Sequence, residues 1–250
     1  MRIVIIIFLF FSSCSTKKDV LLFQDAKPGS EYKFNFKSIK IQSDDILKIK
    51  ISSKAVDLTS LYNTDKQITG TNSIEGSQIE GYAVNQMGYV NIPTLGPVMV
   101  RGLNLTEAAE RIQNLLKEED VLKNATVDIK ILNAYFTVIG EVNRPGRYGF
   151  LENNMDILQA LGMAGDLTIN GKREDIKIIS KIDDNMKLSS VDLTSANLLF
   201  SDRFQIFPGD VIIVNANNAR VKNAGVVGNF GNLLSVLSFI LTSIVLISNN

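Results

Sequence analysis

The last part of the chain carries no charge, and this constrains its fold more than any other feature. No Lys, Arg, Asp or Glu follows Lys222, which leaves 28 uncharged residues at 223–250. From Leu233 to Ile247 nearly all of them are Leu, Ile, Val, Phe or Ser. A run of about 20 apolar residues is typical of a membrane helix. We therefore expect a C-terminal transmembrane helix over residues 222–248.

Small residues recur along this tail at spacings of four and three, which places them on one face of a helix. They are Ala224, Gly228, Gly231, Ser235, Ser238 and Thr242. Large aliphatic residues such as Leu237 and Leu241 fall outside this stripe. In lipid, small residues mark the face on which helices approach one another. The stripe predicts packing between copies of the chain, and it equally suits the wall of a wet pore. A helix buried in a soluble core and a simple anchor are the alternatives.

The beginning of the chain has the pattern of a secretory signal. Arg2 precedes nine apolar residues at 3–11, and Ser12-Ser13-Cys14 follows them. Nine apolar residues are too few to span a bilayer, which takes about 20. A Cys after two small residues resembles the bacterial lipobox, in which the thiol receives a diacylglycerol. We expect a signal peptide at 1–13, lipidation at Cys14 and a polar tether at 14–36. An ordinary signal with a chance Cys and a short membrane anchor are the alternatives.

Residue types that the chain lacks narrow its chemistry. It has no His, its single Cys is Cys14, and 26 Lys and Arg balance 26 Asp and Glu. Because the commonest general base and zinc ligand is missing, we expect no enzyme activity, no catalytic residues, no metal and no cofactor. A net charge of zero with scattered cations argues against a nucleic-acid partner. Asp45 and Asp210 could form a glycosidase-like carboxylate pair, but we interpret both as turn residues.

Between the two ends, short strands and a few helices predict an α+β fold. The first unit covers residues 37–132. Leu47, Ile49 and Ile51 alternate with lysines, which predicts a half-buried strand, and residues 127–131 repeat that pattern. Asn104 is followed three residues later by Glu107, a capping box that predicts a helix. The apolar face of this helix consists of Leu105, Ala108, Ile112, Leu115 and Leu116. Residues 52–78 form a long polar stretch that predicts an exposed excursion or a binding loop.

The segment after this excursion contains turn signals. Residues 85–88 read Asn-Gln-Met-Gly and lie between apolar runs at 82–84 and 89–92, which predicts a hairpin. Pro93 and Pro97 then bracket a tight crossing into the next strand.

The second unit covers residues 133–216 and has the size of a β-grasp module. A strand at 136–140 is followed by Asn143-Arg144-Pro145-Gly146, which favours a type II turn. Residues 156–164 predict a short helix that Gly165 ends. Strands at 176–179 and 186–191 are expected to pair, and residues 207–210 turn into a last strand at 211–214.

Ten residues of the two units are best explained by turn chemistry rather than by contact with a ligand. They are Asp45, Gly88, Pro93, Gly96, Gly140, Pro145, Gly146, Gly165, Gly209 and Asp210.

The order of these motifs resembles that of the outer-membrane polysaccharide export proteins of the Wza type. Residues 41–49 are similar to the opening strand motif of the family, and residues 88–103, with Glu107-Ala108, to its hairpin, crossing and helix. Residues 140–148 resemble the signature that opens its soluble-ligand-binding (SLBB) β-grasp domain, and Ala164-Gly165 and residues 208–212 its later landmarks. Asp44 stands where the family often has Gly, and only one β-grasp copy fits.

The resemblance implies an export domain followed by one SLBB domain, in a lipoprotein of the outer membrane with its soluble domains in the periplasm. It implies a homo-oligomeric ring that exports capsular or exopolysaccharide, membrane lipid as a partner, and an inner-membrane polysaccharide co-polymerase or chain-length regulator. The energy must come from elsewhere, since the sequence has no P-loop. The alternative is a tethered lipoprotein that binds a glycan or a periplasmic partner and forms no pore. An exported hydrolase is disfavoured by the lack of His and of a nucleophile motif.

Overall fold

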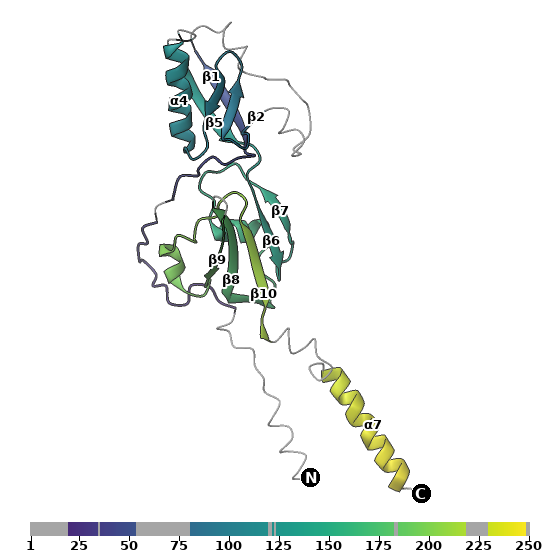
Figure 1. Ribbon diagram of the computed structural model, residues 1–250. Helices are drawn as coiled ribbons and strands as arrows, with labels where there is room; N and C mark the ends of the chain where they lie inside the picture. The colour runs from purple at the N-terminus through teal and green to yellow at the C-terminus, as the bar shows by residue number, and fades with distance from the viewer. Residues whose placement is uncertain are drawn as a thin grey trace.

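The computed structural model describes residues 20–34, 36–53, 81–119, 122, 124–182, 185–218 and 230–248. The predicted signal peptide, Cys14, Ala224, Gly228 and nearly all of the polar stretch at 52–78 lie outside these residues. The described chain is a mixture of helices and strands, as predicted. Figure 1 shows two units, one above the other, with the helix α7 apart from both.

The described residues of the first unit form five strands and one helix, arranged as a three-stranded sheet, a separate hairpin and a covering helix. These are β1 (Ile46–Ser52), β2 (Tyr82–Ala83), β3 (Tyr89–Ile92), β4 (Gly96–Met99), α4 (Leu105–Glu118) and β5 (Thr126–Ile131). The sheet has the order β2-β1-β5, and both pairings are antiparallel. Leu47 pairs with Ile131 and Ile49 with Ile129, and all four side chains are buried. The alternation seen in the sequence is therefore confirmed as the buried face of this sheet.

The helix α4 begins as its sequence predicts. The side chain of Asn104 accepts a hydrogen bond from the amide of Glu107 at 2.9 Å, and the Glu107 carboxylate accepts one from the amide of Asn104 at 2.8 Å. This reciprocal capping satisfies two amides that the helix itself leaves unpaired. Ala108, Ile112 and Leu116 are fully buried. The capping box and the apolar face are both confirmed.

The hairpin predicted around residues 85–88 is wrong in its strand pairing. The turn itself exists, since the amide of Asn85 donates to the carbonyl of Tyr89 at 2.9 Å. However, β2 pairs with β1, while β3 pairs with β4 across the turn that follows Pro93. The reason is burial: Val90 of β3 and Val98 of β4 face each other and are both buried, so the core fixes this register.

The second unit is a five-stranded mixed sheet with one helix and one short 3₁₀ turn. Its elements are β6 (Tyr135–Gly140), β7 (Gly146–Gly149), α5 (Ile157–Met163), β8 (Gly171–Ile182), β9 (Asn185–Val191), η3 (Ala196–Phe200) and β10 (Val211–Ala216). The strand order is β7-β6-β10-β8-β9. The central pair, β6 with β10, is parallel, and the other pairings are antiparallel. The predicted pairing of the strands that became β8 and β9 is confirmed.

Gly140 lies where β6 leaves the central pair, and only glycine fits there. Its φ is +97°, and a Cβ would lie 2.0 Å from the carbonyl oxygen of Val214 on β10. Gly146 is different, because its φ is not positive. The type II turn predicted at Pro145 and Gly146 is therefore wrong, since that turn needs a positive φ at the glycine.

Other contacts hold this turn instead. The hydroxyl of Tyr148 donates to the carbonyl of Arg144, and the amide of Arg144 donates to the carbonyl of Ala164 at 2.8 Å. The side-chain amide of Asn143 donates to the carbonyl of Gly165 at 2.7 Å. The motif at 143–148 thus fastens the β6–β7 turn to the C-terminal end of α5.

The segment before β1 lies along the second unit and then reaches the first. We call residues 20–34 and 36–41 the strap. Its amides at Phe23 and Gln24 donate to the carbonyls of Leu193 and Thr194 at 3.1 and 2.7 Å. At its far end the amide of Ile41 donates to the carbonyl of Leu103 at 2.9 Å. The strap therefore joins both units, as a second connection beside the direct linker at 132–134.

Further contacts fix the middle of the strap. Phe34 packs edge-on against Phe204, with ring centroids 5.1 Å apart. The buried Gln205 accepts from the amide of Lys37 at 2.7 Å and donates to its carbonyl at 2.8 Å. These two bonds imitate one step of a β-ladder and align the strap with the second unit.

The helix α7 spans Phe230–Ser248, and none of the side chains described on it is buried. A search of the described residues finds no helix with the length and apolar character needed to cross a membrane. The transmembrane helix expected over 222–248 is therefore not supported. Residues 222–229 of the expected span lie outside the described residues, and several side chains of the described helix are hydroxyls.

Candidate functional site: the cavity between the two units

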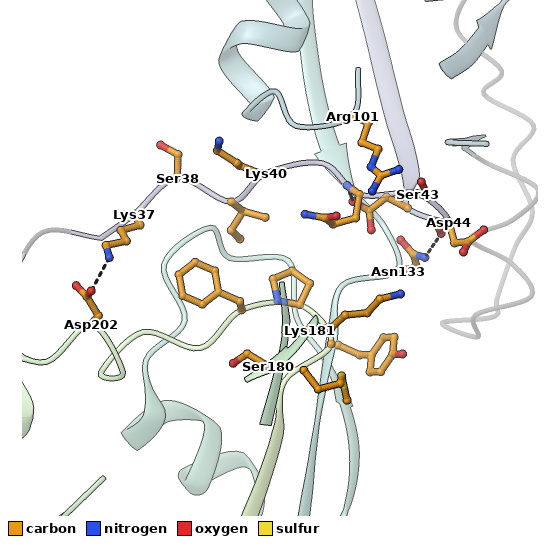
Figure 2. A pocket seen from close by; sticks show the side chains of 18 of the residues that line it. Lys37, Ser38, Lys40, Ser43, Asp44, Arg101, Asn133, Ser180, Lys181 and Asp202 are labelled. Carbon is orange, nitrogen blue, oxygen red and sulfur yellow. Dashed lines mark hydrogen bonds and ion pairs between the residues drawn. The ribbon is translucent and has the colours of Figure 1, made fainter. Parts of the chain in front are cut away.

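A cavity of about 900 Å³ lies between the two units. One side of the cavity consists of the strap, the turn before β1, and Gln86 and Arg101 of the first unit. The other side consists of β6, β8, β9 and the loop before β10, all from the second unit. The lining residues are Lys37, Ser38, Ile39, Lys40, Gln42, Ser43, Asp44, Asp45, Gln86, Arg101, Asn133, Tyr135, Ser180, Lys181, Met186, Asp202, Arg203, Phe207, Pro208 and Gly209. Figure 2 shows Arg101 on the wall of the first unit and Lys181 on that of the second.

Two similar turns form opposite parts of the wall. In residues 42–45 the carboxylate of Asp45 accepts from the amide of Gln42 at 2.7 Å. In residues 207–210 the carboxylate of Asp210 accepts from the amide of Phe207 at 2.9 Å. The third residue of each turn has a positive φ, 70° at Asp44 and 84° at Gly209. Each turn leads directly into a strand. In both turns the aspartate carboxylate holds the turn by accepting a hydrogen bond from a backbone amide.

The position of Asp44 explains one departure from the family pattern. Its φ of 70° lies in the left-handed region, where glycine is favoured. Aspartate is among the residues that tolerate this region best. Its carboxylate also accepts from the side-chain amide of Gln86 at 2.8 and 3.0 Å, which ties the turn to the loop after β2.

Burial raises the pKa of both turn aspartates. For Asp45 the loss of water around the carboxylate raises the pKa to about 6, against the opposing hydrogen bond from Gln42, and the nearby charge of Asp44 adds to the rise. Burial likewise raises the pKa of Asp210, while the Phe207 amide, the Ser180 hydroxyl and Arg203 act in the opposite direction. Arg203 donates to the Ser180 oxygen at 2.8 Å, so these three residues form one connected network.

Asn133 holds the linker to the turn of the first unit. Its side-chain amide donates to the carbonyl of Asp44 at 2.9 Å, and its side-chain oxygen accepts from the amide of Ile46 at 2.8 Å. Figure 2 shows the bond from Asn133 to the Asp44 backbone as a dashed line. Asn133 is the polar residue between the two apolar strands β5 and β6, which was the available sequence signal, and our sequence analysis missed it.

The walls of the cavity carry more positive than negative groups. The cations are Lys37, Lys40, Arg101, Lys181 and Arg203, and the carboxylates are Asp44, Asp45 and Asp202. Lys37 and Asp202 form an ion pair at 2.7 Å across the strap. Within the described part of the chain, no ion pair is found for Lys40, Arg101 or Lys181. The cavity lining as a whole thus keeps an excess of positive charge, with five cations and three carboxylates.

The ten predicted turn residues do not gather at one place. Asp45 and Gly209 line the cavity, and Asp210 lies beside it in the second turn. The others lie in turns or at strand ends of the two units, away from the cavity lining. Gly88, Gly96, Gly165 and Gly209 have positive φ values like Gly140, and Gly146 does not. No cluster of three or more described His, Cys, Asp or Glu residues could hold a metal ion.

Four residues of the predicted helix stripe lie on α7, which is separate from the cavity. They are Gly231, Ser235, Ser238 and Thr242. The hydroxyls bond within the helix: Ser235 donates to the carbonyl of Gly231 at 2.9 Å, Ser238 to that of Ser235 at 3.0 Å, and Thr242 to that of Ser238 at 2.7 Å.

A comparison with known families assigns the first unit. Residues 35–132 match the family of polysaccharide biosynthesis/export proteins. This unit is a polysaccharide export domain. The match begins in the strap and ends at Leu132 in the linker, so it includes the whole first unit. The predicted relation to polysaccharide export proteins is confirmed for this unit. Its members are export components associated with the cell envelope rather than a family of enzymes. No curated protein matches the chain.

Proposed function

We propose that this chain is a subunit of an oligomeric outer-membrane channel that exports capsular or exopolysaccharide. The observation that carries the proposal is the polysaccharide export domain at residues 35–132. The domain holds no arrangement of described residues that we can interpret as catalytic, and the half-buried carboxylate of Asp45 bonds to its own turn. A passive conduit is consistent with this chemistry.

The topology of the second unit supports its assignment as an SLBB β-grasp domain. A β-grasp fold has a hairpin, a helix, a second hairpin and a last strand that inserts in parallel beside the first. Strands β6 and β7, helix α5, strands β8 and β9, and strand β10 follow this plan. The parallel pair at the centre is the least common element, and it is the one that Gly140 makes possible.

The chemistry of α7 supports assembly through this helix. Its large apolar side chains are exposed on all sides, for example Phe239 and Ile247, and exposed apolar surface of this extent calls for a partner. The hydroxyls of the stripe are already satisfied by carbonyls of the same helix. A neighbouring helix can therefore cover the stripe without leaving a polar group unpaired. We propose that copies of α7 pack together along Gly231, Ser235, Ser238 and Thr242.

The remaining parts of the proposal concern the envelope. A diacylglycerol on Cys14 would hold the chain at the outer membrane, with both described units in the periplasm. The strap follows this region of the chain and binds the second unit, so the lipid would lie on the side of that unit. An inner-membrane co-polymerase would supply the polymer, because the chain has no nucleotide-binding motif.

The alternative is a tethered glycan-binding lipoprotein that forms no pore. The cavity between the two units favours it, because a single copy of the chain already forms this cavity. The mass of the full chain extracted in a mild detergent separates the two functions. A closed ring of several subunits, seen by native mass spectrometry and electron microscopy, supports the channel. A stable monomer supports the binding protein and rejects the channel.

A further inference from the structure

We propose that the cavity between the two units binds an acidic segment of a saccharide, of the uronic-acid class. The inference rests on the proposed function, which makes the ligand a polysaccharide. It adds the place where one subunit contacts that polysaccharide and the sign of the charge that the polysaccharide carries. Its basis is the excess of cations in the cavity lining, with Arg101 and Lys181 on facing walls.

The cavity has the size of a ligand site. Its volume of about 900 Å³ lies within the range of about 300–1,000 Å³ that such sites occupy. A sugar chain offers apolar C–H faces as well as polar groups, and the lining has both kinds of partner. Tyr135 and the highly exposed Met186 supply apolar surface, while the cations supply charge. Arg147 already covers one approach to the Tyr135 ring at 3.3 Å and adds to the positive field.

The charge distribution selects an anion. Arg101 enters from the first unit and Lys181 from the second, and Lys40 comes from the strap. Of the carboxylates that line the cavity, Asp202 is paired with Lys37, and those of Asp44 and Asp45 are engaged by amides of Gln86 and Gln42. A carboxylate on a sugar ring would meet cations that no described acidic residue already occupies. Charge-assisted hydrogen bonds of this kind are the strong ones in protein sites.

The two walls belong to units that are joined by the strap and the linker. A ligand that contacts Arg101 and Lys181 together therefore bridges the units. We expect the bound saccharide to slow hydrogen exchange in peptides from both walls, those that contain Arg101 and those that contain Lys181. A ligand held by one unit alone would protect one peptide only.

Calorimetric titration of the full chain in a non-ionic detergent tests the proposal. The probe is tetragalacturonate. Its fully methyl-esterified form is the neutral control, and inorganic phosphate tests for binding of a free anion. We expect binding of tetragalacturonate that weakens with added salt, and at least about tenfold weaker binding of the ester. Equal binding of the acid and the ester, or no binding of the acid, overturns the proposal. Phosphate that competes as well as the acid also overturns it, because the site would then be an anion site without a saccharide.

Matched variants locate the site. Arg101→Ala and Lys181→Ala should each weaken binding of tetragalacturonate about tenfold. Arg111 and Lys117 are exposed on α4 and do not line the cavity, so Arg111→Ala and Lys117→Ala should leave binding unchanged. Circular dichroism checks that every variant is folded. An equal loss in all four variants overturns the proposal, because it would reflect general charge attraction.

Failure of the saccharide-binding proposal can be distinguished from failure of the proposed channel function. A ring that exports polymer in cells but does not bind tetragalacturonate rejects this inference alone. A monomer that binds it through Arg101 and Lys181 rejects the channel alone.

Discussion

Replacing Gly140 by alanine tests the packing on which the second unit depends. The added Cβ would lie 2.0 Å from the carbonyl oxygen of Val214, so β6 and β10 would have to move apart by more than 1 Å. The positive φ costs an alanine about 1–2 kcal/mol. The movement also strains the bond from the Glu141 amide to the Val214 carbonyl, now 2.9 Å, and an unpaired buried group costs about 1–3 kcal/mol. Together these costs lower the unfolding free energy of the second unit by about 2–5 kcal/mol.

Hydrogen exchange at increasing urea, followed by mass spectrometry, measures the unfolding free energy of each unit separately. Peptides from β6 and β10 should lose protection at lower urea in Gly140→Ala, while peptides from α4 and β5 act as an internal reference. Gly146→Ala is the matched control, because its φ is not positive and the nearest atom to its Cβ, the Tyr148 hydroxyl oxygen, is 3.9 Å away. It should stay within about 1 kcal/mol of the natural chain. Equal behaviour of the two variants would refute this account of the β6–β10 contact.

Three further substitutions test the turns and the strap. The raised pKa of Asp45 means that the aspartate favours folding below about pH 3.8 and that this contribution is lost as the pH rises through about 6. Asp45→Asn keeps the acceptor for the Gln42 amide. In urea unfolding it should therefore match the natural chain at pH 3.5 and be about 1–3 kcal/mol more stable at pH 7.5. A variant less stable than the natural chain at pH 7.5 would contradict the burial argument. Asp44 has a left-handed backbone conformation, so Asp44→Gly should change the free energy of unfolding by less than about 1 kcal/mol, whereas Asp44→Val should lower it by about 2 kcal/mol. Similar melting curves for the two variants would show that the φ angle at this position does not matter. Gln205→Ala removes the hydrogen-bond partner of the amide and the carbonyl of Lys37, so limited proteolysis should cut the strap faster than in the natural chain. Unchanged cleavage would mean that the aromatic contacts alone hold the strap.

Local patterns in the sequence predicted local structure well. The alternation at Leu47, Ile49 and Ile51 gave β1, because one face of a sheet must be buried and the side-chain period of a strand is two. The capping box at Asn104 and Glu107 gave the start of α4, because both partners lie within four residues of each other. The short helix predicted at 156–164 is α5, and the structure adds a capping box between Asp156 and Gln159 that the sequence analysis did not name.

Features that depend on distant residues were missed or wrong. Strand β3 pairs with β4 instead of β2 because Val90 and Val98 are buried together, which a turn signal at residue 88 cannot reveal. Gly146 follows a proline and seemed suited to a type II turn, yet the contacts of Asn143 and Arg144 with the end of α5 set its conformation.

The candidate cavity could not be read from the sequence. Arg101 and Lys181 are 80 positions apart in the sequence, and only the docking of two units through the strap and Asn133 places them on facing walls. The uncharged tail is an opposite case, in which the sequence predicted a feature that the structure does not support. Its composition predicted a membrane-spanning helix, and the described residues contain none.

The central claim is that this chain takes part in moving polysaccharide out of the cell. The most direct measurement deletes its gene and determines how much polymer lies outside the cell and how much stays in the envelope, with the natural chain restored as the control. The account predicts that external polymer falls while retained polymer rises, and that restoration reverses both. External polymer at its normal level would contradict the account, and so would a loss of polymer from both places, which would assign the chain to synthesis instead of export.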